Sequence, residues 1–319
     1  MLKRIWTLLL LAAFPAAAAD YPTKPVRIIV PFAPGGATDL LIRPLSEKLT
    51  DVLGQPMVID NRGGAGGNIG AQFAAQAAPD GYTMLVTTAG VIVTNKSLYK
   101  NLPFDPTVAF DPVSIIASLP NLLVVSPKSG MTSVADLIAR AKTKPGSVTF
   151  ASGGNGTSNH LAGELLKHLT QTEFTHIPYK GGGPAVLATL SGEVTMLFAT
   201  MPSAMQQVKA GRLTALAVTS EKRSPAAPEV PTMAEAGVKG FEVSENWVGA
   251  LVPRGTPAPI IDRLQKALAR AAEDPETQKR LAAGGYEIVA STPAVMGRAI
   301  KRQSQSWDQV IRAANIRAD

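Results

Sequence analysis

Short apolar segments of strand length alternate with longer amphipathic segments along nearly the whole chain. A chain with this alternation folds as an α/β structure, because each amphipathic helix buries its apolar face against a sheet built from neighbouring strands. We therefore predict mostly parallel sheets with helices on both faces. In the first part of the chain, the predicted strands are 26–30, 57–60 and 83–88, and the predicted helices are 40–53 and 69–78.

The alternation breaks at residues 119–121, and a second α/β series follows it. About 300 residues are too many for one typical hydrophobic core and suit two domains. Ser133 and Asp136 have the spacing of a capping box, whereas Pro44 lies inside a predicted helix, where we expect a kink. The remaining predicted strands are 122–126, 148–152, 175–177, 194–198, 213–219 and 247–252, and the remaining predicted helices are 134–142, 157–169, 184–190, 204–210, 260–272 and 293–313.

The first nineteen residues have the three-part pattern of a secretory signal peptide. Lys3 and Arg4 precede an apolar run at 5–14, and alanines occupy positions 17–19. The apolar run is shorter than the roughly 20 residues that a membrane-spanning helix needs. We therefore predict a signal peptide at residues 1–19, cleavage after Ala19, and a mature protein in the periplasm.

The composition argues against several classes of function. The chain has no cysteine, which excludes disulfides, thiolate metal sites and a cysteine nucleophile. His160, His168 and His176 have no metal-ligand spacing, and the sequence has no Gly-x-Ser-x-Gly nucleophile elbow. We expect no catalytic residue, no metal and no cofactor, and the absence of an arginine-rich run argues against nucleic acid. The formal net charge of +7 either steers anions toward the protein or reflects an ordinary solvated surface.

A glycine-rich loop, PFAPGGATD at 31–39, joins the first predicted strand to the first predicted helix. Glycines let a backbone approach a ligand closely, and a helix N-terminus offers free N–H groups and a partial positive charge. In α/β sheets, ligands bind at the carboxyl ends of parallel strands. We favour an anion site over a plain turn here. Its candidate ligand-binding residues are Phe32, Pro34, Gly35, Gly36, Thr38 and Asp39.

A second loop, ASGGNGTSNH at 151–160, has the same strand–glycines–helix arrangement and adds hydroxyl groups. A third, YKGGGP at 179–184, also follows a strand, but Lys180 is on the wrong side of the glycines for a P-loop. The glycines at 63–70 resemble a dinucleotide fingerprint only loosely, because they follow the second strand. His160 either donates to a carboxylate or is structural. The candidate ligand-binding residues of the second and third loops are Ser152, Gly153, Asn155, Gly156, Thr157, Ser158, His160, Tyr179 and Gly181.

Several ordered motifs resemble the solute receptors of tripartite tricarboxylate transporters, also called Bug-type receptors. The resemblance covers essentially the whole mature chain and is specific for the family, but not for its ligand. The motifs are YPTKPVRIIVPF at 21–32, PGG with an aspartate at 34–39, NRGGAGGNIG at 61–70, APDGYT at 78–83, GTSNH at 156–160, YKG at 179–181, EVPT at 229–232 and PRGTP at 253–257.

The resemblance implies a type II periplasmic-binding-protein fold, in which two α/β lobes are joined by two crossing strands and close on the ligand. Together with the break in the alternation, it predicts one lobe from residues 20–120 and 248–319, and another from 121–247. It further implies that a carboxylate is held between the loop at 32–38 and the loop at 153–158. The expected partners are a small carboxylate and the membrane subunits of a tripartite tricarboxylate-type transporter, and we expect a monomer.

The segment 192–202 departs from the family pattern. Thr195 and Ala199, the latter a candidate ligand contact, stand where acidic or amide residues are common in relatives. This departure disfavours a ligand with a distal ammonium group, such as an amino acid, and favours a dicarboxylate, an aromatic acid or an apolar-tailed acid. Taken with the family resemblance, the predicted ligand is a dicarboxylate, a tricarboxylate or an aromatic acid. The leading hypothesis is a receptor for transport. The alternatives are a subunit that presents its ligand to a membrane histidine kinase and an enzyme on the same fold, which the missing acid/base residues disfavour.

Overall fold

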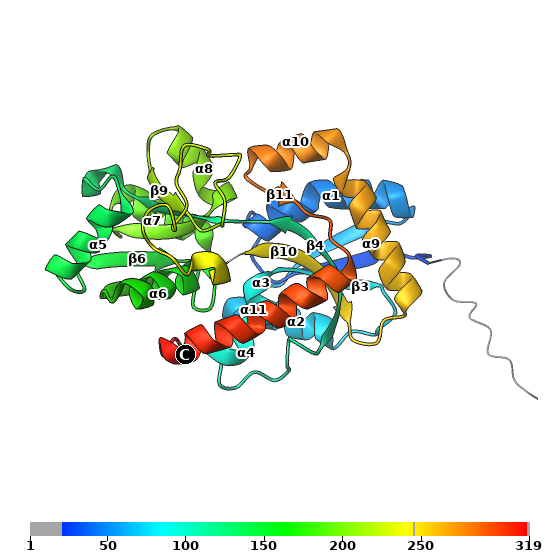
Figure 1. The fold of residues 1–319 in the computed structure, drawn as a ribbon. Helices are drawn as coiled ribbons and strands as arrows, with labels where there is room; N and C mark the ends of the chain where they lie inside the picture. Colours follow the sequence, from blue (N-terminus) through cyan, green and yellow to red (C-terminus); the bar gives the residue numbers. More distant parts are fainter. Residues whose placement is uncertain (1–20, 245, 318–319) are drawn as a thin grey trace, which may run out of the picture.

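The computed structural model describes residues 21–244 and 246–317, so the predicted signal peptide and its cleavage after Ala19 lie outside the described residues. Two separate β-sheets form the centres of two α/β halves that lie side by side (Figure 1). The first sheet has the strand order β11-β4-β10-β3-β1-β2, and the second has the order β7-β6-β8-β5-β9. The predicted α/β fold with two lobes is therefore confirmed.

The first sheet collects strands from both ends of the chain. α1 and α9 pack against each other over one of its faces, and α11 lies along β4 and α3. Its strands are β1 (Val26–Val30), β2 (Met57–Asn61), β3 (Thr83–Thr88), β4 (Phe110–Ser118), β10 (Trp247–Pro253) and β11 (Glu287–Ile288). The associated helices are α1 (Ala37–Leu53), η1 (Ala65–Gly67), α2 (Asn68–Ala75), α3 (Ala89–Val93), α4 (Asn95–Leu98), α9 (Ala258–Ala272), α10 (Pro275–Ala283) and α11 (Pro293–Ala313).

The second sheet is built from one continuous stretch of chain. α6 and α7 both pack against β6 and β8. Its strands are β5 (Asn121–Val125), β6 (Val148–Ser152), β7 (Phe174–Pro178), β8 (Met196–Thr200) and β9 (Thr214–Val218). The associated helices are η2 (Pro127–Ser129), α5 (Val134–Thr143), α6 (Ser158–Thr170), α7 (Gly182–Ser191), α8 (Met201–Lys209) and η3 (Phe241–Ser244), and Ser133 and Asp136 form the predicted capping box of α5.

The prediction of mostly parallel sheets was wrong. β1 pairs in parallel with β2 and β3, and β6 pairs in parallel with β7 and β8. By contrast, β10 is antiparallel to β3 and β4, and β5 is antiparallel to β8 and β9. The reason is topological: β4, β5 and β10 flank the two connections between the sheets, and they are inserted among strands that are joined by helices.

The two connections between the sheets run next to each other. β4 ends at Ser118 and β5 begins at Asn121, so only two residues separate a strand of one sheet from a strand of the other. The returning chain enters β10 beside β4, with Trp247 opposite Ser118, and Leu119 N–H donates to Asn246 O at 2.8 Å. This arrangement fits two crossing strands. The residue boundaries predicted for the lobes stay a prediction.

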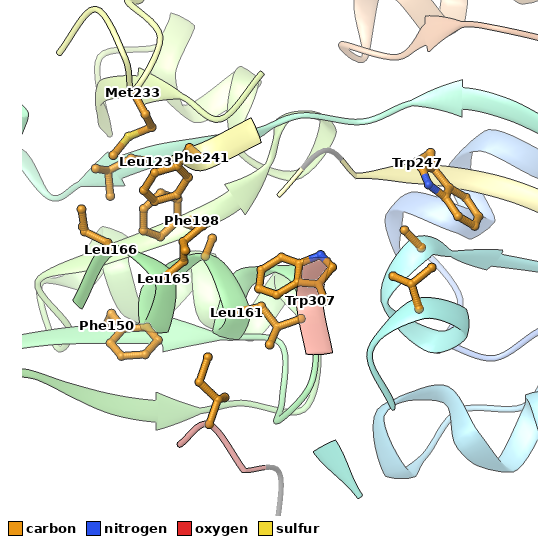
Figure 2. Packing of buried hydrophobic residues seen from close by; sticks show 14 of the residues in the cluster. Leu123, Phe150, Leu161, Leu165, Leu166, Phe198, Met233, Phe241, Trp247 and Trp307 are labelled. Carbon is orange, nitrogen blue, oxygen red and sulfur yellow. The ribbon is translucent and has the colours of Figure 1, made fainter. Parts of the chain in front are cut away.

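Apolar packing ties each sheet to its helices. Leu41, Leu45 and Leu49 of α1 are buried with strand residues of the first sheet. A second cluster extends from Trp247 of β10 through Trp307 of α11 to Leu161 of α6, and Figure 2 shows the Trp307 ring next to Leu161. The C-terminal helix therefore contributes to the packing of both halves.

The structure contains elements that the sequence pattern did not predict. These include α3, α4, β4, α10 and β11, and most of them are short or interrupted by proline or polar residues. Pro44 lies inside α1 as expected, but α1 continues through it as one helix of 17 residues. Pro44 is itself buried beside Leu41 and Leu45, so packing compensates for the backbone hydrogen bond that proline cannot donate.

Candidate ligand-binding site

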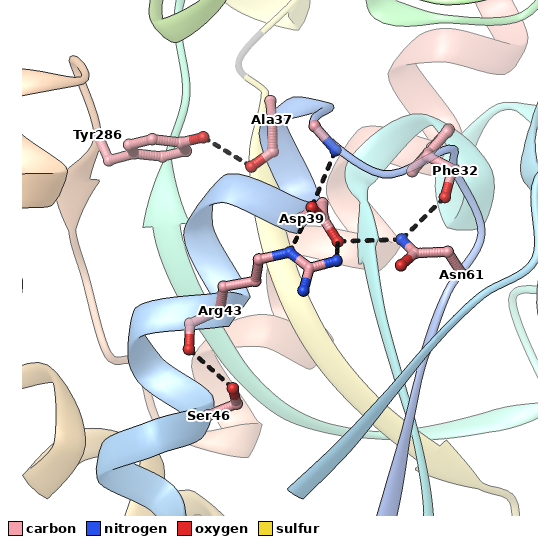
Figure 3. Close-up of polar contacts among 8 residues, drawn as sticks. Phe32, Ala37, Asp39, Arg43, Ser46, Asn61 and Tyr286 are labelled. Carbon is pink, nitrogen blue, oxygen red and sulfur yellow. Dashed lines mark hydrogen bonds and ion pairs between the residues drawn. The ribbon is translucent and has the colours of Figure 1, made fainter.

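Asp39 organises the loop between β1 and α1. Its carboxylate accepts hydrogen bonds from Gly35 N (2.9 Å), Arg43 Nε (2.7 Å) and Nη2 (2.9 Å), and Asn61 Nδ2 (3.1 Å), as Figure 3 shows. Burial of Asp39 raises the pKa of its carboxyl group, but these hydrogen bonds outweigh burial and the pKa lies below its ordinary value. Because both oxygens are engaged inside the loop, Asp39 shapes the loop and does not offer a free group to a ligand.

The N-terminus of α1 presents free donors next to this loop. Its N-cap is Gly36, which has no side chain, so no capping hydrogen bond satisfies the N–H groups of the first turn. Gly35 has a φ of 79°, a conformation that glycine adopts without strain. Thr38 is only 2% exposed, and its hydroxyl has no hydrogen-bond partner among the described residues. These donors suit an anion.

Two side-chain hydrogen bonds hold the second loop from within. Gly154 N donates to Ser152 Oγ (3.1 Å), and Thr157 Oγ1 donates to Gly154 O (2.7 Å). Thr157 is the N-cap of α6, yet its side chain makes no capping bond. The first-turn N–H groups of α6 therefore remain available, as they do in α1.

His160 supports the second loop from inside the protein. It is 4% exposed, and its Nδ1 accepts a hydrogen bond from Gly156 N at 3.2 Å. Burial, followed by the neighbouring His176 and Lys167, lowers the pKa of His160 to about 3. The imidazole is therefore neutral at pH 7, with its proton on Nε2. Its Nδ1 is committed to the loop, which favours the structural reading of this residue.

The two loops approach each other through η1. A Cβ atom placed on Gly67 would lie 3.6 Å from the ring of Phe32, and one placed on Gly66 would lie 3.1 Å from Asn155 O. The hydroxyl of Tyr99, which follows α4, donates to the same Asn155 carbonyl at 3.2 Å. Loop 153–158 of the second half thus contacts η1 and Tyr99 of the first half.

Two other groups of predicted residues have different places. Tyr179 N donates to Ser152 O (2.9 Å) and Gly181 N donates to Gly153 O (3.2 Å), so their backbones brace the start of the second loop. The Tyr179 hydroxyl instead donates to Glu193 at 2.7 Å, and partial burial with this hydrogen bond raises its pKa to about 12. The side chain of Ala199 is 1% exposed within an apolar cluster. The structure therefore does not bring the Tyr179 hydroxyl or the Ala199 methyl to the loops.

Thr195 lies at the far end of the second sheet from loop 153–158. Its hydroxyl accepts from Thr149 N at 3.2 Å, and its N–H donates to the Thr149 hydroxyl at 2.9 Å. β8 is parallel to β6, so Thr195 precedes β8 at the end where β6 begins, whereas the loop follows the end of β6. The identity of Thr195 therefore carries no information about a ligand at the loop.

The sequence analysis did not identify several polar residues that lie near strand ends close to the two loops or the crossings between the sheets. The hydroxyl of Thr87 and both amide atoms of Asn121 are buried and have no hydrogen-bond partner among the described residues. Asn246 Nδ2 donates to Ser158 Oγ at 3.3 Å. Thr87 could have been predicted, because it lies at the carboxyl end of β3, next to the carboxyl end of β1 that leads into the first loop. Asn121 and Asn246 flank the crossings and gave no motif.

Other kinds of site find no support in residues 21–244 and 246–317. No group of three or more histidine, aspartate or glutamate side chains in this part of the chain could hold a metal ion. No helix within it has the length and apolar character needed to span a membrane. What the loops offer is a set of hydroxyl and N–H donors.

Comparison with known proteins gives one consistent result. The family model described as the tripartite tricarboxylate transporter family receptor matches residues 41–316. The protein BugT of Bordetella pertussis (strain Tohama I) is 39% identical over 301 residues, which cover 94% of this chain and 92% of BugT.

Solved structures agree. The periplasmic binding protein BugD is 36% identical with a TM-score of 0.86, covering 93% of this chain and 99% of BugD. R. palustris Rpa4515 with adipate is 37% identical with a TM-score of 0.88, covering 93% of this chain and 99% of Rpa4515. MatC from Rhodopseudomonas palustris with bound malate is 31% identical with a TM-score of 0.85, covering 91% of this chain and all of MatC. This chain belongs to the tripartite tricarboxylate transporter receptor family, whose members are solute-binding receptors and not enzymes.

Proposed function

We propose that this protein is a periplasmic receptor that captures a small dicarboxylate and delivers it to the membrane subunits of a tripartite tricarboxylate-type transporter. The observation that carries the proposal is the pairing of two uncapped helix N-termini, those of α1 and α6, behind loops that belong to different sheets. Two relatives have adipate and malate bound, which supports a dicarboxylate as the ligand class.

The chemistry of the loops suits a carboxylate. Helix N-termini bind anions because their unsatisfied N–H groups and the helix dipole both favour negative charge. The hydroxyls of Thr38 and Ser158 add donors, and a hydrogen bond to a charged acceptor contributes about 1.5–3 kcal/mol. A ligand with a carboxylate at each end could engage both helix N-termini, which is the reason to favour a dicarboxylate over an aromatic acid.

Two features support the place and the partner. The pattern of residues 1–19 predicts export and cleavage after Ala19, and the family is named for a receptor of a membrane transporter. Mass spectrometry of the exported protein tests the first, with Asp20 expected as the N-terminal residue. Ligand uptake by vesicles that contain the transporter subunits tests the second. Ligand-dependent kinase activity without uptake would instead support the sensor hypothesis.

A thermal-shift screen over small carboxylates tests ligand capture directly. A ligand at 100 times its Kd stabilises the folded state by about 2.7 kcal/mol, which is readily visible. We expect malate, adipate or a related dicarboxylate to raise Tm, and we expect the uncharged diamide adipamide, which has the shape of adipate, to leave it unchanged. Equal shifts with adipate and adipamide, or no shift with any carboxylate, would contradict the proposal.

A further inference from the structure

Three aromatic rings pack together directly beneath loop 153–158. His160 from α6 stacks on His176 from β7 with ring centroids 4.2 Å apart and an interplanar angle of 24°. Phe150 from β6 stacks on His176 at 4.7 Å, and it is the residue paired with His176 in the parallel β6–β7 register. The ring stack thus joins the strand that leads into the loop, its neighbour and the helix that follows the loop.

The hydrogen bonds of the two imidazoles reach both ends of the loop. His160 Nδ1 accepts from Gly156 N at 3.2 Å, and His176 Nε2 lies 2.7 Å from Ser152 Oγ. The same Ser152 oxygen accepts from Gly154 N at 3.1 Å. The N–H groups of Gly154 and Gly156 are therefore both directed inward, one through a serine and one straight to a histidine.

The hydrogen bond that His160 accepts from Gly156 requires an uncharged ring. An imidazolium has a proton on each nitrogen, so a charged His160 could not accept the hydrogen bond from Gly156. Burial lowers the pKa of His176 to about 4 and, together with His176 and Lys167, that of His160 to about 3. Lys167, on α6 itself, is the charged group that acts on His160 among the described residues, and it also disfavours protonation.

We propose that His160 and His176 are positioning residues, a pair of neutral stacked imidazoles that holds loop 153–158 in the shape that presents the α6 N-terminus to a carboxylate. This inference rests on the proposed function, because it assumes that the loop binds an anion. It has a specific consequence for the ligand. The Gly156 amide is taken by His160, so the ligand must use first-turn N–H groups of α6 and the nearby hydroxyls.

Direct contact between His160 and the ligand predicts the opposite response to pH. An imidazole that donates to a carboxylate binds it more tightly when protonated, so affinity would rise as pH falls through the usual histidine pKa of about 6.5. A positioning pair that stays neutral predicts a Kd that is constant within twofold from pH 8 to pH 6.

Substitutions at His160 separate a hydrogen-bond acceptor from a packed ring. His160→Gln keeps an acceptor for Gly156 N–H, whereas His160→Phe keeps an aromatic ring and has no acceptor. We expect at least a fivefold higher Kd for malate or adipate in His160→Phe, and less than a twofold change in His160→Gln and in the control His168→Gln. Equal losses in both His160 variants, in proportion to their losses of Tm, would mean that His160 only packs and would overturn the proposal.

Nuclear magnetic resonance gives a readout that needs no ligand. The chain has three histidines, so His168→Gln, His160→Gln and His176→Gln assign every imidazole signal. We expect His160 to be protonated on Nε2 alone and both stacked rings to stay neutral down to pH 5. We also expect slow hydrogen exchange of the Gly156 amide, which should be lost in His160→Phe and retained in His160→Gln. A His160 that titrates near pH 6.5, or that has its proton on Nδ1, would overturn the proposal. Wild-type protein that binds no carboxylate, with this signature intact, would instead overturn the proposed function.

Discussion

The hydroxyls of Thr157 and Ser158 allow a direct test of the second loop. Thr157 Oγ1 donates to Gly154 O at 2.7 Å, and Ser158 Oγ accepts from Asn246. Removing the Thr157 hydroxyl loosens the loop by about 1 kcal/mol, and removing a Ser158 hydrogen bond to a bound carboxylate loses about 1.5–3 kcal/mol. Since 1.4 kcal/mol is tenfold in affinity, we expect the double change Thr157→Ala with Ser158→Ala to raise Kd at least tenfold.

The same structure predicts that the fold survives this double change. The Thr157 side chain does not cap α6, so no cap is lost. The double change removes two hydrogen bonds, from Thr157 to Gly154 O and from Asn246 to Ser158, so the free energy of unfolding should fall by about 2 kcal/mol. Thr143→Ala is the matched control, because Thr143 Oγ1 donates to a backbone carbonyl, Ala139 O, at 2.8 Å on the exposed side of α5. Calorimetric titration with the best dicarboxylate from the screen measures Kd, and thermal unfolding measures stability. A Kd within twofold of the wild-type value would refute the assignment of this loop to the site.

Three further expectations concern stability and loop contact. Gly66→Ala should raise the Kd for the dicarboxylate at least fivefold, because the φ of 62° is strained for alanine and the Tyr99 hydroxyl and Asn155 carbonyl leave no room for a methyl group. The control Gly183→Ala places its methyl group in open space and should leave Kd unchanged. Lowering the pH from 7.5 to 5 should reduce the free energy of unfolding by about 2 kcal/mol through His160, and by less through the partly exposed His176. The reason is that only the unfolded chain takes up protons between pH 6.5 and the lowered pKa values of the folded protein. Urea titration measures this loss, which should be smaller in His160→Gln. Tyr99→Phe removes one hydrogen bond between the halves, and scattering should show a larger mean radius without ligand.

The sequence predicted those elements whose signal is local. The strands at 26–30, 83–88 and 148–152 were located to the residue because each is a short, mostly apolar or β-branched run between proline or glycine turn signals. β4 was missed because Asp111 and Pro112 interrupt its apolar pattern, and it is held in the sheet by β10, which lies more than 120 residues further along the chain. No local pattern reports such a pairing.

The candidate site shows the same division. The two glycine loops could be found from their strand–glycine–helix arrangement. The residues that hold them could not: Asn61 reaches Asp39 across 22 positions, His176 reaches Ser152 across 24, and Tyr99 reaches Asn155 across 56. Asp39 was among the candidate ligand-binding residues as part of the first loop motif, and His160 was a candidate for which a structural role was the alternative. Their hydrogen bonds instead fall on the loops themselves.

The contacts between the halves bear on what keeps the two halves together when a ligand binds. Loop 153–158 touches η1 and Tyr99, and the Tyr99 hydrogen bond contributes only about 1 kcal/mol. A ligand that binds with a micromolar Kd gains about 8.2 kcal/mol, so such contacts are weak beside ligand binding. A ligand shifts the equilibrium between open and closed forms only by its differential affinity for them. A carboxylate that must engage α1 and α6 together binds the closed form preferentially, so the ligand, and not the Tyr99 contact, should supply most of the free energy that keeps the halves together.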